Sequence, residues 1–128
     1  MKVAVCSAQS YDRQFLLAAN RDIGHELTFF DSPLCEETRQ MVAGFSSVCV
    51  FVNDTLNAGV LQTLAAQGTR LIALRCAGFN HVDIQAANDL GLRVVRVTAY
   101  SPHSVAVHNV APMLALTRPL TPAYKLVR

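Results

Sequence analysis

Residues 71–83 read LIALRCAGFNHVD, an apolar run that ends in a turn of small residues. In an open sheet of parallel strands, ligands bind just beyond the carboxyl ends of the strands. Ala77 and Gly78 have almost no side chain at such a point, so their backbone N–H groups can approach an anionic ligand closely. The stretch predicts a cradle for a carboxylate or a phosphate. The alternative is a tight strand-to-helix turn that binds no ligand.

Four more apolar runs of the same kind occur at regular intervals, and segments with helical spacing separate them. The spacing predicts strands at Lys2–Cys6, Glu26–Phe30, Ser47–Val52, Arg70–Leu74 and Leu92–Val97. Alternating strands and helices imply right-handed crossovers and a parallel sheet with helices on both faces. Capping and stop residues mark the expected helix ends, in pairs: Ser10 and Gly24, Asn57 and Gly68, Asn80 and Gly91.

The last thirty or so residues have a different character. Ser101 as N-cap and Pro102 at the first helical position predict a helix start. The residues Val105–Leu116 are apolar on nearly every face, a pattern that requires burial all round. Pro112 falls inside this segment, where a proline removes a backbone hydrogen bond at a cost of about 3 kcal/mol. Residues after Pro119 are expected to be irregular.

Composition narrows the classes of protein. The chain has 128 residues, of which 52% are hydrophobic and 16% charged, and its net charge is +2, so a single globular domain is expected. The arginines are scattered, which does not favour binding to nucleic acid or to a membrane surface. No apolar run reaches the roughly 18 residues of a membrane span. Polar residues follow the first six residues too soon for a secretory signal, so the expected location is the cytoplasm.

The four cysteines are widely spaced and form no Cys-x-x-Cys pair, which disfavours a metal site or a disulfide framework. Cys6 and Cys49 lie in apolar runs and are interpreted as small buried hydrophobes. Cys76 lies beside the candidate anion loop, where a nearby helix N-terminus could lower its pKa. Its alternative role is to fill the end of the strand.

Several separate motifs together resemble one enzyme family. They are MKVAV at the start, VFVND at 50–54, IALRCAGFNHVD at 72–83, AANDLGLRVVRV at 86–97 and AYSPHSVAVH at 99–108. In this order they resemble the NAD-dependent D-2-hydroxyacid dehydrogenases, most closely the D-lactate dehydrogenases, over essentially all of the chain. The resemblance implies an α/β fold, a flavodoxin-like three-layer sandwich. Its five-stranded parallel sheet would have the order 2-1-3-4-5, with an additional C-terminal apolar helix.

The resemblance also implies roles for four residues. Ala77 and Gly78 would donate backbone hydrogen bonds to the carboxylate of a 2-keto acid such as pyruvate, and Cys76 would line the same loop. Tyr100, in the match to the family's Tyr-Ser-Pro, would offer its hydroxyl to the substrate. Two fixed donors and one adaptable donor suit a planar carboxylate. The alternative for Tyr100 is a half-buried aromatic residue that covers the strand end.

Other parts of the family's machinery find no match. A nicotinamide site needs a Gly-x-Gly-x-x-Gly turn, and all six glycines here are isolated. In the family that turn, the catalytic histidine, its acidic partner and the substrate-binding arginine lie beyond the matched span. Residues 1–100 are therefore expected to be a substrate-binding domain, and 101–128 an interdomain or dimerisation helix with an irregular tail. The expected chain is truncated, binds no NAD itself, has no catalytic residue and is inactive alone.

Two further expectations concern partners and alternatives. A 2-keto or 2-hydroxy acid is the expected ligand, and a homo-oligomer is expected through residues 101–118, because their apolar side chains need a partner. A phospho-receiver domain is disfavoured, since no carboxylate follows the first strand and Asp54 is its one partial match. A flavodoxin-like cofactor binder would need a Gly/Thr-rich loop that is also absent. A non-enzymatic module that binds a small acid or a protein remains open.

Overall fold

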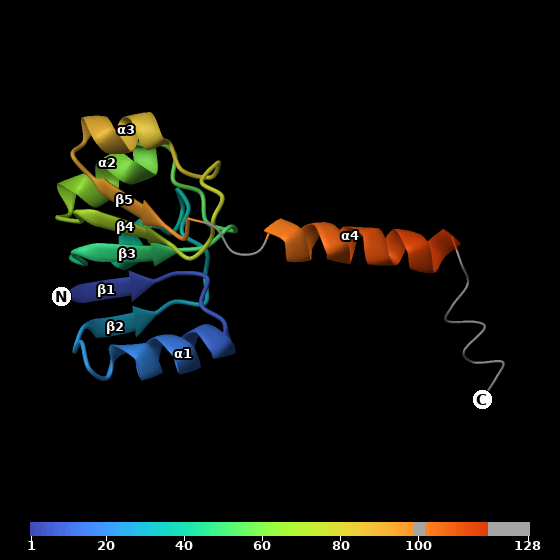
Figure 1. Cartoon of the computed structure of the whole chain (residues 1–128). Helices are drawn as coiled ribbons and strands as arrows, with labels where there is room; N and C mark the ends of the chain where they lie inside the picture. Colours follow the sequence, from blue (N-terminus) through green and yellow to red (C-terminus); the bar gives the residue numbers. More distant parts are fainter. Residues whose placement is uncertain (99–101, 118–128) are drawn as a thin grey trace. The chain divides into compact units, whose positions relative to one another are not determined.

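The computed structural model describes residues 1–98 and 102–117. The chain divides into two compact units, Met1–Thr98 and Ala99–Arg128. Of the elements described, the first unit contains the strands and all but one of the helices, and the second contains the remaining helix (Figure 1).

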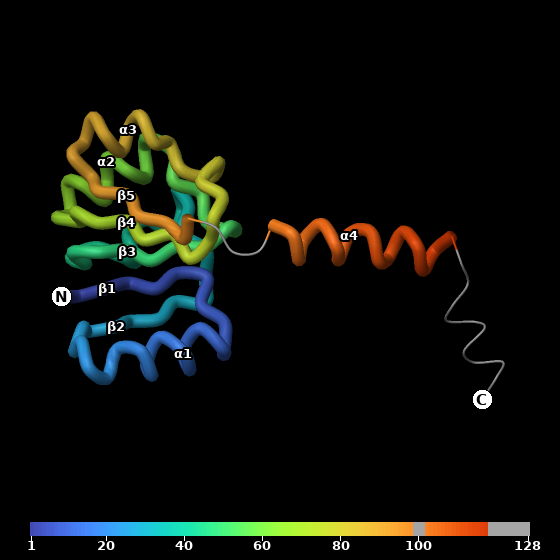
Figure 2. The backbone as a smooth tube through the Cα atoms, in the orientation of Figure 1, coloured from blue at the N-terminus to red at the C-terminus, as the bar shows by residue number. Residues whose placement is uncertain are grey.

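Five short strands form one parallel sheet, as the sequence predicts. They are β1 (Lys2–Val5), β2 (Glu26–Phe29), β3 (Ser47–Val50), β4 (Leu71–Leu74) and β5 (Arg93–Arg96). Their order in the sheet is β2-β1-β3-β4-β5, and every neighbouring pair is parallel. This order confirms the predicted flavodoxin-like topology. Because all five strands run the same way, their carboxyl ends meet at one edge of the sheet (Figure 2).

Two hydrophobic clusters lie on opposite faces of the sheet. Successive side chains of a strand point to opposite faces, and in β1 Ala4 belongs to one cluster and Val5 to the other. Helix α1 (Ser10–Asn20) packs on the smaller cluster through Leu16. Helices α2 (Ala58–Ala66) and α3 (Ile84–Asp89) cover the larger cluster, so the fold has three layers.

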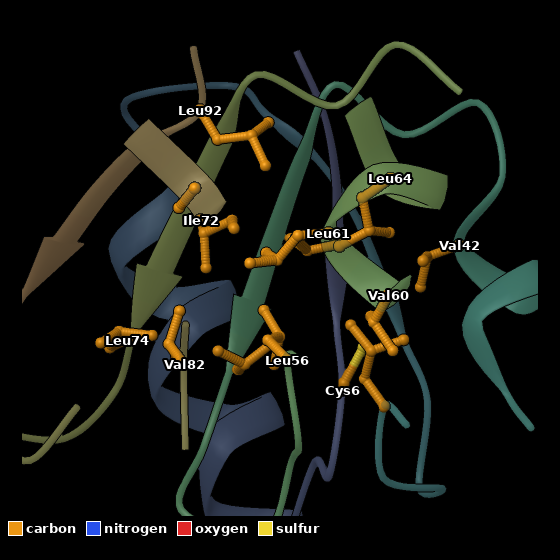
Figure 3. Close-up of a cluster of buried hydrophobic side chains, with 14 of the residues drawn as sticks. Cys6, Val42, Leu56, Val60, Leu61, Leu64, Ile72, Leu74, Val82 and Leu92 are labelled. Carbon is orange, nitrogen blue, oxygen red and sulfur yellow. The ribbon is translucent and has the colours of Figure 1, made fainter. Parts of the chain in front are cut away.

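The larger cluster is the main core of the first unit. Val60, Leu61 and Leu64 of α2 are fully buried in it with Ile72 of β4 (Figure 3). The connection from β2 to β3 carries one short 3-10 helix, η1 (Arg39–Val42), which packs against α2. Burying these four aliphatic side chains contributes roughly 6–12 kcal/mol of hydrophobic stabilisation. The contact between α2 and the sheet is therefore a large part of the stability of the first unit.

The helix ends agree with the sequence at some positions and differ at others. Asn57 caps α2 as predicted, its side chain accepting a hydrogen bond from the N–H of Val60 at 3.0 Å. Helix α1 begins at Ser10 itself, and Gln9 is its N-cap. The prediction of Asn80 as the cap of the next helix is wrong. Asp83 caps α3 instead, accepting a hydrogen bond from the N–H of Ala86 at 3.0 Å.

Helix α4 (Pro102–Thr117) is the described part of the second unit. It continues through Pro112 rather than ending there. Its large apolar side chains lie on several faces of the helix; they are Val105, Val107, Val110, Met113, Leu114 and Leu116. The predicted cap Ser101 and the tail after Pro119 lie outside the described residues. Among the described helices, none is both long and apolar enough to cross a lipid bilayer.

Candidate functional site

The candidate site is the loop that follows β4 at the carboxyl edge of the sheet. Cys76, Ala77 and Gly78 lie together in this loop, directly after Arg75. The loops that follow β1, β2 and β3 begin at the same edge, because the strands are parallel (Figure 2). Tyr100, the fourth residue expected in the site, lies outside the described residues.

A buried carboxylate joins the loops after the first three strands. Asp54 is 1% exposed, and its Oδ1 accepts hydrogen bonds from Ser7 Oγ at 2.8 Å and from the N–H of Leu34 at 2.7 Å. Its Oδ2 accepts from the N–H of Phe51. Ser7 itself has φ of 50°, an uncommon conformation for a residue with a side chain. The carboxylate of Asp54 is therefore occupied in holding the edge of the sheet together.

Arg75 anchors the beginning of the candidate loop. Its Nη1 lies 2.6 Å from Oδ2 of Asp12, its Nη2 donates to the carbonyl of Cys6, and its guanidinium lies 5.2 Å from the ring centroid of Phe51. Burial would raise the pKa of Asp12, but the hydrogen bond and charge of Arg75 and the N–H of Gln9 hold that pKa below its ordinary value. Arg75 thus ties the loop to β1 and α1.

Two backbone N–H groups of the loop have no described partner. Among the contacts described for residues 1–98 and 102–117, none uses the N–H of Ala77 or of Gly78. The carbonyl of Ala77, by contrast, accepts a hydrogen bond from Nη1 of Arg96 at 2.6 Å. N–H groups in a loop that no described contact uses can donate to an anion. The assignment of Ala77 and Gly78 to a carboxylate stays a prediction.

Gly78 is a glycine that the described fold does not require. Four glycines take φ between 70° and 94°, where a side chain would be strained: Gly24, Gly44, Gly68 and Gly91. A Cβ at Gly59 would lie 3.3 Å from Oε1 of Glu36. Gly78 has no such φ, and a Cβ there would meet nothing within 4 Å among the described residues. A side chain at this position would therefore be tolerated by the described residues.

The thiol of Cys76 is turned inward. The residue is 3% exposed, and its Sγ donates to the carbonyl of Gly78 at 3.2 Å and lies 4.0 Å from Nε2 of His81. Burial raises the pKa of this thiol, so it stays protonated at neutral pH. The structure therefore does not show a Cys76 thiol that is activated by a helix N-terminus. The hydrogen bond from this thiol to the carbonyl of Gly78 shapes the loop.

Sequence reasoning missed Asp12, Asp54, Arg75 and Arg96 as parts of this edge. It treated the two arginines as scattered surface charge and weighed Asp54 only as a phospho-acceptor. Their partners lie far away in the sequence, as with Ser7 and Asp54 or Arg75 and Cys6, so no local motif marks them. The signal that could have found them is a charged residue at the end of an apolar run, where a strand reaches the edge of the sheet.

The turn from β1 to α1 does not have the glycines of a dinucleotide-binding turn. The turn from β1 to α1 reads Cys6-Ser7-Ala8-Gln9, and no glycine is present there to let a pyrophosphate approach the backbone. Within residues 1–98 and 102–117, no three side chains that could ligate a metal ion come together either.

Comparison with known proteins identifies the family. Residues 3–118 match the model of the catalytic domain of the D-isomer specific 2-hydroxyacid dehydrogenases. A D-lactate dehydrogenase of Escherichia coli is 48% identical over all 128 residues, and a 2-hydroxyacid dehydrogenase homolog of Haemophilus influenzae is 46% identical over the same length. The chain spans 39% of the length of each of these two relatives.

Solved structures agree with this match. The apo-structure of D-lactate dehydrogenase from Escherichia coli superposes with a TM-score of 0.82 at 48% identity, covering 98% of this chain and 40% of that one. A D-lactate dehydrogenase with NAD+ from Lactobacillus jensenii gives a TM-score of 0.71 at 31% identity, covering 94% of this chain and 37% of that one.

Proposed function

The chain belongs to the D-isomer specific 2-hydroxyacid dehydrogenase family, and from this membership we propose that it forms the substrate-binding part of a D-lactate dehydrogenase-like oxidoreductase. The proposed ligand is a small 2-keto or 2-hydroxy acid such as pyruvate or D-lactate. The observation that carries the proposal is the pair of N–H groups at Ala77 and Gly78, which no contact among the described residues uses. Gly78 also has no φ or close contact, among those residues, that requires a glycine.

The chemistry of the loop suits a carboxylate. The two N–H groups would donate to its oxygens, and a hydrogen bond to an ionised acceptor is about twice as strong as a neutral one. Cys76 would line the same loop and keep its shape through the bond to Gly78. Tyr100 would contribute its hydroxyl as a third donor. The role of these residues is to bind the acid and orient its carbonyl group.

Hydride transfer itself requires more than the proposed carboxylate loop supplies. The nicotinamide carbon must be held against the substrate carbonyl with a proton donor in hydrogen-bond reach. The family's cofactor, bound elsewhere, would donate the hydride to a 2-keto acid as NADH or accept it from a 2-hydroxy acid as NAD+. The D-lactate dehydrogenase of Lactobacillus jensenii was solved with NAD+, which supports this choice of cofactor. We therefore expect a protein of these 128 residues to oxidise no NADH with pyruvate.

The experiment is a titration of the ¹⁵N-labelled chain, followed by the amide resonances of residues 76–80. Pyruvate should shift the amides of Ala77 and Gly78, and methyl pyruvate, which lacks the charged carboxylate, should not. NADH should leave this loop unchanged. Binding of neither pyruvate nor D-lactate would overturn the proposal and favour a non-enzymatic protein-interaction module.

Two variants at Gly78 make the test specific. Gly78→Pro removes one donor and should abolish the shifts caused by pyruvate, provided that circular dichroism shows a folded chain. Gly78→Ala fills the empty space beside the loop without a steric clash, so it should weaken pyruvate binding at unchanged or slightly increased thermal stability. Unchanged affinity in both folded variants would contradict the assignment of this loop.

Two coarser features belong to the same proposal. The apolar side chains of α4 favour association with a second copy of this chain through residues 101–118. All four cysteines are free thiols, which is the state expected in a reducing compartment and supports a cytoplasmic location.

A further inference from the structure

The side chain of Arg96 connects the end of β5 to the candidate loop. In the sheet Arg96 lies opposite Leu74, the last residue of β4, so its side chain is level with the beginning of the loop. Its Nη1 lies 2.6 Å from the carbonyl oxygen of Ala77, and its guanidinium lies 5.2 Å from the ring centroid of Phe79. One side chain thus holds the loop at two points.

The contact with Ala77 fixes more than a carbonyl. The C=O of Ala77 and the N–H of Gly78 belong to one planar trans peptide group and point in opposite directions. When Arg96 holds the oxygen, the N–H of Gly78 is directed to the other side, away from the guanidinium. The direction of a donor proposed to bind a ligand is therefore set by a residue that does not touch this donor.

The peptide group between Ala77 and Gly78 can flip readily unless a contact holds it. Its rotation changes φ of Gly78, and glycine accepts positive and negative φ almost equally. The hydrogen bond from Cys76 Sγ reaches the carbonyl of Gly78, which belongs to the next peptide group. Within residues 1–98 and 102–117, the bond from Arg96 is the one described contact to the oxygen of Ala77.

We propose that Arg96 is a positioning residue, which holds the carbonyl of Ala77 so that the N–H of Gly78 faces the substrate carboxylate. The inference rests on the proposed function of the loop. The cation also polarises the peptide group that it holds, and a polarised N–H is a stronger donor. Phe79 confines the guanidinium through a cation–π contact, which keeps the donor aimed at Ala77.

The first measurement needs no ligand. The residual dipolar coupling of the Gly78 N–H bond reports its direction in the ¹⁵N-labelled chain. In Arg96→Gln we expect this coupling to fall toward the average of two orientations, while the coupling of Leu74 stays the same. Arg96→Lys, which keeps a charged donor, should retain most of the native value.

The second measurement is the dissociation constant of pyruvate. Arg96→Gln should weaken binding about tenfold, the effect of one charge-assisted hydrogen bond, and Arg96→Lys should recover most of the affinity. Arg93→Gln is the matched control, since it removes the same charge from the same strand. Residue 93 points to the opposite face of the sheet from residue 96, so this variant should bind as the parent chain does.

The outcomes separate the two proposals. An unchanged Gly78 coupling in Arg96→Gln overturns the role of Arg96, even if affinity falls, because affinity alone would then reflect lost charge. An altered coupling with undiminished pyruvate affinity also overturns it. If the parent chain binds no pyruvate, the proposed function fails, and the coupling still decides whether Arg96 orients the peptide group.

Discussion

At the residue scale, the ion pair of Asp12 and Arg75 links the stability of the first unit to pH. The carboxylate and the guanidinium are 14% and 12% exposed, so solvent screens them only in part. Because the pKa of Asp12 is lowered in the folded chain, its ionised form stabilises the fold. This contribution is fully present above the unfolded pKa of about 3.9 and is lost as pH falls below it.

We expect Asp12→Asn to lower the free energy of unfolding by about 1–2 kcal/mol at pH 7, because Arg75 loses its charged partner. The difference between the variant and the parent chain should shrink as pH falls below about 4. Urea unfolding at a series of pH values measures it. Asp22→Asn removes a charge from an exposed position just after α1 and should show little effect at any pH. A pH-independent difference for Asp12→Asn would contradict the linkage.

The residues of the carboxyl edge also mark where sequence reasoning stops. It located the loop at Cys76, Ala77 and Gly78 because small residues after an apolar run are a local signal. The roles of Arg75 and Asp54 depend on contacts made 69 and 47 positions away. Such contacts follow from the order of strands in the sheet, so they become visible only when the fold is assembled.

At the scale of elements, the strands were predictable and one helix start was not. Each strand falls within its predicted range. The central strands β3 and β4 are largely apolar and buried, as is typical of parallel strands that are covered on both faces. Asn80 and Asp83 both fit the pattern of an N-cap. Between them the chain forms a bridge in which the N–H of Leu56 donates to the carbonyl of His81, and the N–H of Asp83 donates back to Leu56. That extended pairing delays the helix until Asp83.

This difference gives a matched pair of variants. We expect Asp83→Ala to lower the free energy of unfolding by about 1 kcal/mol, since the N–H of Ala86 loses its cap. Asn80→Ala should change it by less than about 0.5 kcal/mol, the usual range for an exposed residue without such a role. Thermal unfolding of both variants in one buffer measures the contrast. Equal losses, or a larger loss for Asn80→Ala, would mean that α3 begins before Ile84.

At the scale of the whole molecule, α4 predicts self-association. Val110 and Leu114 lie one turn apart on the same side of the helix and are more than half exposed. Burying such side chains against a second copy contributes roughly 1.5–3 kcal/mol each. Light scattering should therefore give a mass of at least twice the 13.9 kDa of one chain.

The double variant Val110→Lys and Leu114→Lys should shift that mass to 13.9 kDa, since two charges cannot be buried in an apolar interface. His103→Lys with Thr117→Lys adds the same number of lysines at the two ends of α4 and should leave the mass unchanged. A parent chain that stays monomeric at all concentrations would show that α4 does not mediate assembly.

The burial of the Cys6 and Cys49 thiols determines how they can be oxidised. Burial raises the pKa of Cys6 to about 12, with a further contribution from the charge of Asp54, and raises that of Cys49 to about 11. Electrophiles and peroxides attack the thiolate, so neither sulfur reacts while the sheet is closed. Irreversible oxidation of the core must wait for an opening fluctuation. The chemical lifetime of these two thiols is therefore set by how often the fold opens.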